Sequence, residues 1–260
     1  MAYKAFDLTG KVALITGGNG GIGLGMGKAI AEAGGDVCIW GTNADKNAAA
    51  VEELKKSGTK VSSLICDVSN QQQVQDCFGE TLKQFGRVDG CFANAGISSK
   101  GTKFTDIEDA EWQKIMGINM DGAFYTMQEA ARHMVERAEN GDPGGRLVGT
   151  ASLAAVSGAA RNEHYAATKG GLISMIRALS VELAGKGITA NAILPGWIET
   201  AMTEASFNWE KFASNVKPRI PARRWGNPED FGGIAVYIMS DASSYHTGDT
   251  FLIDGGYFLF

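Results

Sequence analysis

Short apolar runs alternate with longer amphipathic stretches along most of the chain. The apolar runs predict strands at residues 11–16, 36–41, 60–66, 88–93, 146–152, 188–194 and 247–253. Strands that alternate with helices favour a parallel sheet whose two faces are both covered. We therefore predict an α/β fold, a single-domain doubly wound parallel sheet of the Rossmann-like type with helices on both faces, spanning residues 1–260.

The stretches between these runs predict helices at residues 22–33, 43–57, 71–85, 106–138, 161–184 and 228–239. Asn119 falls inside one of them, and because asparagine is a poor helix former, it suggests a kink or a bound water. Residues 201–216 are expected to form a mobile helical flap over a substrate, with Phe207, Trp209 and Phe212 as apolar contacts.

A glycine-rich turn, residues 17–23, follows the first predicted strand and opens a helix. Backbone N–H groups and the helix dipole favour a phosphate at such a place, and the glycines let it approach closely. The strand–turn–helix context indicates dinucleotide binding, although a turn built for close packing is the alternative. Right-handed crossovers should bring Asn94, Ala95 and Gly96 to the same crevice. Asp67 would either bind an adenine amine there or cap a turn.

Tyr165 and Lys169 are four residues apart in a predicted helix, so their side chains share one face. A tyrosine has a pKa of about 10, and a nearby ammonium favours its phenolate and lowers that pKa. Ser152 ends a predicted strand and offers a hydroxyl donor at the mouth of the sheet. A hydroxyl beside a phenol whose pKa can be shifted suits carbonyl reduction or alcohol oxidation. The alternative is that the pair has no catalytic role and is only a half-buried Tyr beside a solvated Lys.

Together these features resemble the short-chain dehydrogenase/reductase family over nearly the whole chain. The matching positions are Thr16, Gly17, Gly21, Ile22, Gly23, Asn94, Ala95, Gly96, Asn119, Ser152, Tyr165, Lys169, Pro195 and Gly196. The Tyr-x-x-x-Lys spacing is similar to that of the carbonyl and alcohol branch rather than of the enoyl reductases. A longer turn at residues 140–145 departs from the pattern, but it falls in a surface loop away from the chemistry.

The resemblance implies four catalytic residues. Tyr165 would exchange a proton with the substrate oxygen, and Ser152 would hydrogen-bond that oxygen. Lys169 would hold the ribose of a nicotinamide cofactor and depress the Tyr165 pKa, while Asn119 would hold a water that links Lys169 to solvent. The residues expected to contact the cofactor are Gly17, Asn19, Gly21, Ile22, Gly23, Gly41, Thr42, Asn43, Asp67, Val68, Asn94, Ala95, Gly96, Tyr165, Lys169, Pro195, Gly196, Ile198 and Thr200.

The end of the second predicted strand bears on the choice of cofactor. A carboxylate there binds the ribose of NAD, and an Arg nearby accepts the 2′-phosphate of NADP. This chain has Gly41 and Thr42, so nothing repels a phosphate, and Thr42, Asn43 or Lys46 would bind one. We favour NADP(H). The alternative is that Lys46 is a solvated helix lysine and that the enzyme takes NAD(H) or both.

The substrate contacts are expected from Ser152, Tyr165 and the residues around them. The predicted set is Ser152, Ala154, Tyr165, Trp197, Met202 and Trp209, with Ser98, Asn162, His164, Glu199 and Phe207 as further candidates. This mixture fits a neutral, fairly hydrophobic ketone or secondary alcohol, unless Arg161 or Lys103 supplies a positive group for an acidic one. His164 is expected on the rim or in packing rather than as a base.

Composition restricts the functions that the sequence allows. Hydrophobic residues make up 44% and charged residues 20% of the 260-residue chain, and the net charge is -5 without a basic block, which argues against nucleic acid and anionic membranes. No metal site is expected, because there are three His and four Cys without C-x-x-C spacing. The first residues lack a signal-peptide pattern, and no stretch reaches about 20 apolar residues. A cytoplasmic location fits.

Two other classes stay open at this point. One is a dinucleotide-binding redox sensor without turnover, which would have no need of Ser152, Tyr165 and Lys169 together. Another is a flavodoxin-like or methyltransferase fold, which the residues after the first glycine turn do not support. The resemblance also implies a homotetramer assembled through two long helices, and the apolar tail at residues 256–260 would suit either a contact between subunits or the core of its own chain.

Overall fold

The computed structural model describes residues 3–99 and 101–259, and in this part of the chain one seven-stranded sheet organises the fold. Its strands are all parallel and lie in the order β3-β2-β1-β4-β5-β6-β7. The strands are β1 (Val12–Thr16), β2 (Asp36–Gly41), β3 (Val61–Ile65), β4 (Gly90–Ala93), β5 (Gly145–Thr150), β6 (Ile188–Pro195) and β7 (Thr250–Ile253). The predicted doubly wound parallel sheet is confirmed.

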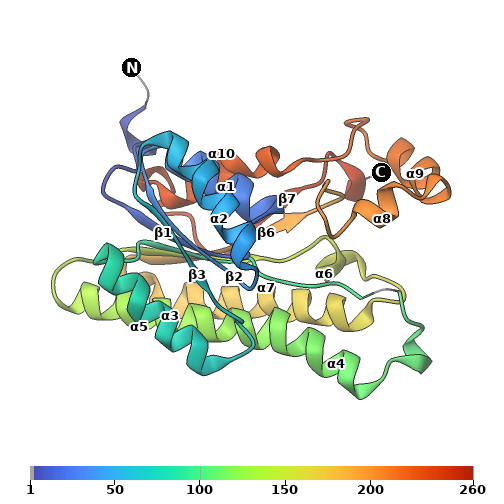
Figure 1. Cartoon of the computed structure of the whole chain (residues 1–260), viewed down its shortest axis with the longest axis horizontal. Helices are drawn as coiled ribbons and strands as arrows, with labels where there is room; N and C mark the ends of the chain where they lie inside the picture. Colours follow the sequence, from blue (N-terminus) through green and yellow to red (C-terminus); the bar gives the residue numbers. More distant parts are fainter. Residues whose placement is uncertain (1–2, 100, 260) are drawn as a thin grey trace.

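Helices cover both faces of the sheet (Figure 1). On one face lie α1 (Gly21–Glu32), α2 (Ala44–Leu54) and α10 (Gly232–Met239), which bury a core with β1 and β2. On the other lie α3 (Gln71–Phe85), α5 (Gly122–Glu139) and α7 (Glu163–Leu183), which bury the larger core. Each helix presents one apolar side to the sheet, as an amphipathic helix must in a three-layer fold.

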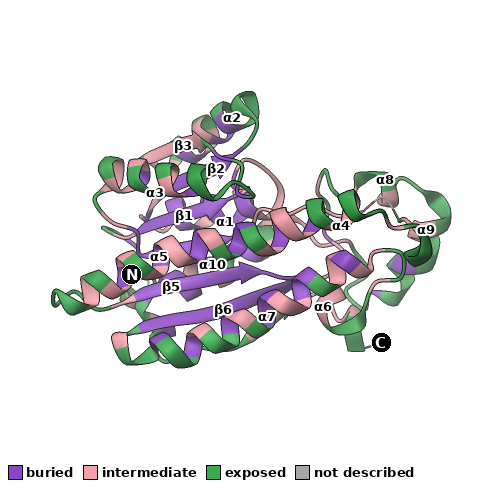
Figure 2. Ribbon diagram, turned by 90° about the horizontal axis from the view of Figure 1, so that it is seen from below, coloured by how far each residue is buried: buried purple, intermediate pink, exposed green. Residues whose placement is uncertain are grey.

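The central strands are continuous apolar runs because both of their faces are covered. All residues of β1, β4, β5 and β6 are buried, whereas the edge strands β3 and β7 are partly exposed. Figure 2 shows this contrast along β5 and β6, which are buried from end to end. The carboxyl ends of all the strands therefore meet at one edge, from which the long connections leave.

Three segments differ from the sequence-based expectation. The helix expected at residues 106–138 is divided into α4 (Asp109–Met116), a π-helical turn (Gly117–Asp121) and α5. The flap region contains two short helices, α8 (Glu204–Phe207) and α9 (Glu210–Val216). A short helix after β5, α6 (Ala154–Ser157), was not expected. Shorter 3-10 turns lie at Lys4–Phe6, Lys55–Ser57, Phe104–Asp106, Ala184–Lys186, Lys217–Arg219, Pro228–Phe231, Asp241–Ser243 and Tyr257–Leu259.

Two sequence-based expectations reach beyond the described residues. Met1 and Ala2, which belong to the N-terminal segment expected to lack a signal peptide, lie outside them. Phe260, the last residue of the apolar tail, also lies outside.

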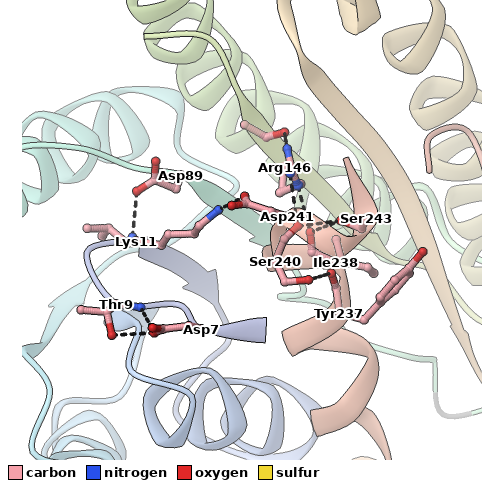
Figure 3. Close-up of polar contacts among 12 residues, drawn as sticks. Asp7, Thr9, Lys11, Asp89, Arg146, Tyr237, Ile238, Ser240, Asp241 and Ser243 are labelled. Atoms are coloured by element: carbon pink, nitrogen blue, oxygen red, sulfur yellow. Dashed lines mark hydrogen bonds and ion pairs between the residues drawn. The ribbon is translucent and has the colours of Figure 1, made fainter. Parts of the chain in front are cut away.

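A buried guanidinium ties β5 to α10 at the amino edge of the sheet (Figure 3). Arg146 is 7% exposed, and it donates to the backbone oxygens of Gly145 (3.0 Å), Ile238 (3.0 Å) and Ser240 (3.2 Å). Burial lowers the pKa of Arg146, and the nearby carboxylates of Asp241 and Asp89 oppose the shift. This network lies at the end of the sheet opposite to the glycine-rich turn.

Replacing Arg146 with leucine should destabilise the protein without touching the opposite edge. The Arg146→Leu variant leaves buried carbonyl groups unpaired, so we expect the free energy of unfolding to fall by about 2 kcal/mol. Arg132→Leu is the matched control, since Arg132 is exposed and pairs only with Glu129, and it should cost less than about 0.5 kcal/mol. Urea denaturation measures both values, and equal losses would contradict this account.

Candidate active site

A cavity of about 570 Å³ opens at the carboxyl edge of the sheet, where the ends of β1, β4, β5 and β6 meet the start of α1. Twelve of the residues predicted for cofactor or substrate line it: Gly17, Asn19, Gly21, Ile22, Asn94, Ala95, Gly96, Tyr165, Lys169, Pro195, Thr200 and Met202. Its other lining residues are Gly20, Leu24, Lys46, Ala49, Ala50, Thr150, Ala151 and Ala201. The lining described here includes no carboxylate.

One threonine fixes the crevice between β1 and β4. Thr16 Oγ1 accepts hydrogen bonds from the backbone N–H groups of Asn94 and Ala95, each at 3.0 Å. The Asn94 side chain returns a bond from Nδ2 to the Thr16 carbonyl at 3.0 Å. As expected from the crossover rule, the two sequence motifs lie together at the switch point of the sheet.

The glycine turn keeps its backbone close to the cavity. Gly17 (φ 63°) and Gly21 (φ 51°) adopt left-handed conformations that favour glycine. A Cβ at Gly23 would lie 2.5 Å from the Gly17 carbonyl oxygen, so this position requires glycine for packing. Gly23 is absent from the cavity lining, and it lets α1 approach the turn rather than touching a ligand itself. The first turn of α1 thus presents an anion site to the cavity.

Two asparagines shape the cavity wall at the end of β2. Asn19 Nδ2 donates to Asn47 Oδ1 at 2.7 Å, and Asn47 Nδ2 donates to the Gly41 carbonyl at 3.0 Å. A Cβ at Gly41 would lie 2.3 Å from Asn19 Nδ2, which explains the glycine. Sequence reasoning missed Asn47, although an asparagine six residues after the strand, on an otherwise apolar helix face, was the available signal.

The two residues after Gly41 in the predicted cofactor set do not face the cavity. Thr42 and Asn43 are exposed and do not line the cavity, and Asn43 Oδ1 accepts from the Lys46 backbone N–H at 2.9 Å as the cap of α2. Lys46, by contrast, lines the cavity. The Asn43 side-chain oxygen caps α2, so a phosphate contact from Asn43 stays a prediction that would have to use its Nδ2 donor.

Asp67 and Val68 also have contacts within the protein. Asp67 Oδ1 accepts from the Ser69 backbone N–H (3.0 Å) and hydroxyl (2.7 Å), as the turn interpretation predicts, and the adenine contact stays a prediction for its other oxygen. The Val68 side chain is buried, and a Cβ at Gly122 would lie 2.6 Å from its Cγ2. Val68 therefore packs against α5, and a ligand could meet only its backbone.

Three predicted catalytic residues, Tyr165, Lys169 and Ser152, lie close together, although Ser152 does not line the cavity. Tyr165 and Lys169 both line it from α7, and the Lys169 Nζ lies 5.7 Å from the centroid of the Tyr165 ring. Lys169 Nζ donates to the Thr150 carbonyl at 2.7 Å. Ser152 lies two residues beyond the end of β5, and its Oγ accepts from the Ala154 backbone N–H at 3.1 Å. The structure thus brings these three predicted residues together.

Asn119 lies in the π-helical turn, which accounts for the kink expected at this asparagine. Its side chain accepts from the Ile97 N–H (2.8 Å) and donates to the Ile97 carbonyl (2.9 Å). A Cβ at Gly96 would lie 3.3 Å from both Asn119 Oδ1 and Lys169 Nζ, so a side chain here would press on both groups. Because both ends of the side-chain amide are occupied, any water at this position would need another partner.

Burial is the main cause of the pKa shifts of Tyr165 and Lys169. It lowers the pKa of Lys169 to about 8, because Lys169 is 4% exposed and no ion pair with it is found among the described residues. Burial also raises the pKa of Tyr165, and the nearby Ser152 hydroxyl opposes the shift. The predicted lowering of the Tyr165 pKa by Lys169 is therefore wrong for the protein by itself, since desolvation of the phenolate outweighs the ammonium 5.7 Å from the ring.

The expected substrate residues divide into two groups. Met202 lines the cavity and is 50% exposed, whereas Trp209 is 59% exposed and lies outside the lining. The Trp197 ring packs edge-on against Phe212 (5.0 Å) and Tyr257 (6.2 Å), and its buried Nε1 has no partner among the described residues. Trp197 and Ala154 are likewise absent from the cavity lining, although both follow strands that end there.

Three further predicted residues are held by the protein itself. Ile198 is 4% exposed and belongs to a core cluster, and a Cβ at Gly196 would lie 2.6 Å from Asp254 Cβ. Neither Ile198 nor Gly196 lines the cavity. His164 is fully buried rather than on the rim, so the packing alternative is the right one.

Two negative findings apply to residues 3–99 and 101–259. No group of His, Cys, Asp and Glu there is arranged to hold a metal ion. None of the helices in this range is both long and apolar enough to cross a membrane.

Because Lys169 is buried, we expect the difference in stability between the wild type and a Lys169 variant to depend on pH. Because the folded pKa of Lys169 is about 8 and the unfolded value is higher, the unfolded chain binds more protons between these values, and stability rises with pH there. Lys169→Met should therefore stabilise the protein below pH 8, by up to roughly 3 kcal/mol at about 1.4 kcal/mol per pKa unit. The gap should close as the pH rises through 8 toward 10.5.

Thermal or urea unfolding of the ligand-free protein from pH 6 to 10 measures this gap. Lys186→Met is the control, since Lys186 is partly exposed and pairs with Glu139, and its difference from wild type should not follow the same curve. A destabilised Lys169→Met variant at pH 7 would contradict the desolvation argument.

Comparison with known proteins places the chain in a family. A family model described as enoyl-(acyl carrier protein) reductase matches residues 17–258. The chain is 37% identical over 249 residues to the 3-oxoacyl-(acyl-carrier-protein) reductase FabG of Chlamydia pneumoniae, covering 96% of this chain and 97% of that one. It is 36% identical over 255 residues to the 2-dehydro-3-deoxy-D-gluconate 5-dehydrogenase of Pseudoalteromonas atlantica, covering 98% of both.

A solved structure from Beutenbergia cavernae, assigned as an NAD(P) dependent gluconate 5-dehydrogenase, holds NADP at low occupancy. It superimposes with a TM-score of 0.91 at 31% identity, covering 98% of this chain and 100% of that one. Likeness of this extent and identity shows that the chain belongs to the short-chain dehydrogenase/reductase family of NAD(P)-dependent oxidoreductases, which act on ketones and alcohols.

Proposed function

We propose that this oxidoreductase uses Tyr165 as the acid/base group that exchanges a proton with the oxygen of a ketone or secondary alcohol. The observation that carries the proposal is the placement of Tyr165 and Lys169 in a glycine-lined cavity, with the Ser152 hydroxyl beside Tyr165. A hydroxyl donor beside a phenol can bind a carbonyl oxygen and protonate it, which is the geometry that general acid catalysis requires.

The cavity fits NADP(H), with NAD(H) as the alternative. The glycine turn at the start of α1 would hold the pyrophosphate, and Asn94, Ala95 and Gly96 would face the nicotinamide half. Lys46 lies at the wall where a 2′-phosphate would sit, and the described lining has no carboxylate to repel it. When bound, the nicotinamide supplies hydride to the carbonyl carbon or accepts it from the alcohol.

The protein's own groups supply orientation and the proton. In the reducing direction, the Ser152 hydroxyl would donate to the carbonyl oxygen and hold it beside Tyr165. The raised pKa of Tyr165 keeps its proton on the phenol at neutral pH, so it is available to the oxygen as negative charge develops there. Lys169, charged below about pH 8, would stabilise the phenolate that remains until solvent returns the proton.

Asn119 would serve by holding the loop after Gly96 in place. Its side-chain amide is committed to both backbone groups of Ile97. We therefore assign the predicted role in holding a water to its backbone rather than to its side chain.

The substrate class is a ketone or secondary alcohol that is neutral and fairly hydrophobic. Met202, Ala201 and Ala151 line the cavity near Tyr165, and its only described charged side chains are Lys46 and Lys169. A hydroxylated, sugar-derived ketone is the second candidate, because sequence relatives of this chain are named for gluconate derivatives.

The flap, the assembly and the location complete the proposal. We infer that residues 1–260 form one domain in which residues 201–216, the region of α8 and α9, close over the substrate. A homotetramer is supported by the exposed apolar side chains of Phe124 on α5 and Val181 on α7. Tyr257 packs on Trp197 of its own chain, while Leu259 is 85% exposed and available to a partner. We place the protein in the cytoplasm.

Replacing Tyr165 with phenylalanine tests the acid/base role. Tyr165→Phe removes the proton and little else, so kcat should fall at least about 100-fold, while cofactor affinity stays within about threefold of wild type. Steady-state kinetics with a panel of ketones and cofactor fluorescence measure the two effects. Retained turnover would sink the role of Tyr165, and full function in cells without turnover would instead support a redox sensor.

Titration with NADPH and NADH tests the choice of cofactor. We expect NADPH to bind at least about tenfold more tightly than NADH, and Lys46→Ala to weaken NADPH by about tenfold, equivalent to roughly 1.4 kcal/mol. NADH affinity should not change. Lys56→Ala is the control, because Lys56 is exposed, pairs with Glu53 and lies away from the cavity. Equal binding of both cofactors would leave NAD(H) as the better assignment.

A further inference from the structure

The residues just before Tyr165 are tied to the loop that follows Gly96. Asn162 Nδ2 donates to Ser98 Oγ at 2.8 Å, and Asn162 Oδ1 accepts from the Ser99 backbone N–H at 3.2 Å. His164, next to Tyr165, places its Nε2 3.2 Å from Glu111 Oε1 on α4. The start of α7 therefore contacts two other elements through side chains that the proposed chemistry does not use.

Glu111 is the centre of this polar cluster. Its carboxylate accepts from the Ser99 hydroxyl at 2.8 Å and from the Thr102 hydroxyl at 3.0 and 3.1 Å, in addition to its contact with His164. These hydrogen bonds, that from Ser99 first, lower the pKa of Glu111 and keep it ionised. One carboxylate thus joins Ser99 and Thr102 of the loop after Gly96 to α4 and α7.

His164 has no other polar anchor among the described residues. Its side chain is fully buried and stacks on Trp112 at 6.4 Å with 14° between the rings, and its Nδ1 has no partner. Removing Glu111 would leave both ring nitrogens buried and unpaired, which is costly inside a protein. The His164 ring is then expected to shift, and Tyr165 is the next residue along α7.

Asn119 holds the same loop from its other end. It binds both backbone groups of Ile97, and its Nδ2 lies 3.4 Å from Thr168 Oγ1 on α7. The loop is therefore fixed at Ile97 by Asn119, at Ser98 and Ser99 by Asn162, and at Ser99 and Thr102 by Glu111. Figure 2 shows α4 beside the start of α7 at the same end of the molecule as α6.

We propose that Glu111, acting through His164 and Ser99, is a positioning residue that sets Tyr165 relative to the loop bordering the substrate. The proposal rests on the proposed function of Tyr165 as the acid/base group. Small displacements of a reacting group slow catalysis strongly, by about 100-fold for 1 Å. Loss of Glu111 should therefore slow proton transfer while leaving the cofactor site, built from α1 and β4, as it was.

Three variants test this with ketone reduction. Glu111→Ala should lower kcat at least tenfold with the cofactor KM within twofold, and should increase the solvent deuterium isotope effect on kcat as proton transfer becomes limiting. Glu111→Gln keeps an oxygen acceptor for Ser99 and should recover most of kcat. Glu108→Ala is the matched control, since Glu108 is an exposed carboxylate on the same segment without a described side-chain bond, and it should behave as wild type.

Several results would overturn the proposal. Unchanged kcat and isotope effect in Glu111→Ala would do so, as would a loss of kcat that circular dichroism accounts for by unfolded protein. An equal loss of kcat in Glu108→Ala would also exclude a specific role for Glu111.

Hydrogen exchange measures the contact without any turnover. In Glu111→Ala, the amides of residues 97–99 and 163–169 should exchange faster together, whereas those at the start of α1 should not. Wild-type protein inactive on every ketone would count against the proposed function alone, and the exchange result would still decide whether Glu111 joins these segments. Unchanged exchange at both segments would reject the positioning role.

Discussion

The hydrogen bonds from Asn94 and Ala95 to the Thr16 hydroxyl are the junction on which the rest of the molecule depends. They join the carboxyl ends of β1 and β4, where the chain changes direction across the sheet. Since all the strands are parallel, every connection that leaves their carboxyl ends starts at this edge. The glycine turn, the loop after Gly96 and the start of α7 are thereby brought around one cavity.

A buried ammonium, without a counter-ion among residues 3–99 and 101–259, lies beside that junction. Lys169 donates to the Thr150 carbonyl, and burial leaves its pKa near 8. A protein tolerates such a group where function needs it, since a neutral side chain would be cheaper to bury. The same burial keeps the proton on Tyr165. The site therefore sets both ionisations chiefly by excluding water, and the charge of Lys169 acts on the phenolate only once one forms.

Around this centre, the precision of the site comes from polar side chains that bind loops rather than ligands. Asn47 holds Asn19 over Gly41, Asn119 holds Ile97, and Glu111 holds His164. Each is a buried or half-buried polar group whose partners lie far away in sequence. Such contacts fix backbone positions to within the tolerance that catalysis needs, and they explain why Gly41 has no room for a Cβ and Gly96 has little.

The sequence by itself determined the sheet, its helices and the meeting of the glycine turn with Asn94, because hydrophobic period and crossover handedness are properties of local sequence and chirality. Its motifs also identified Tyr165, Lys169 and Ser152. Only the tertiary structure decided that Asn43 and Asp67 serve helix ends and turns, and that desolvation controls the pKa of Tyr165. Those outcomes depend on which distant groups surround a side chain, and burial and hydrogen-bond partners exist only once the chain has folded.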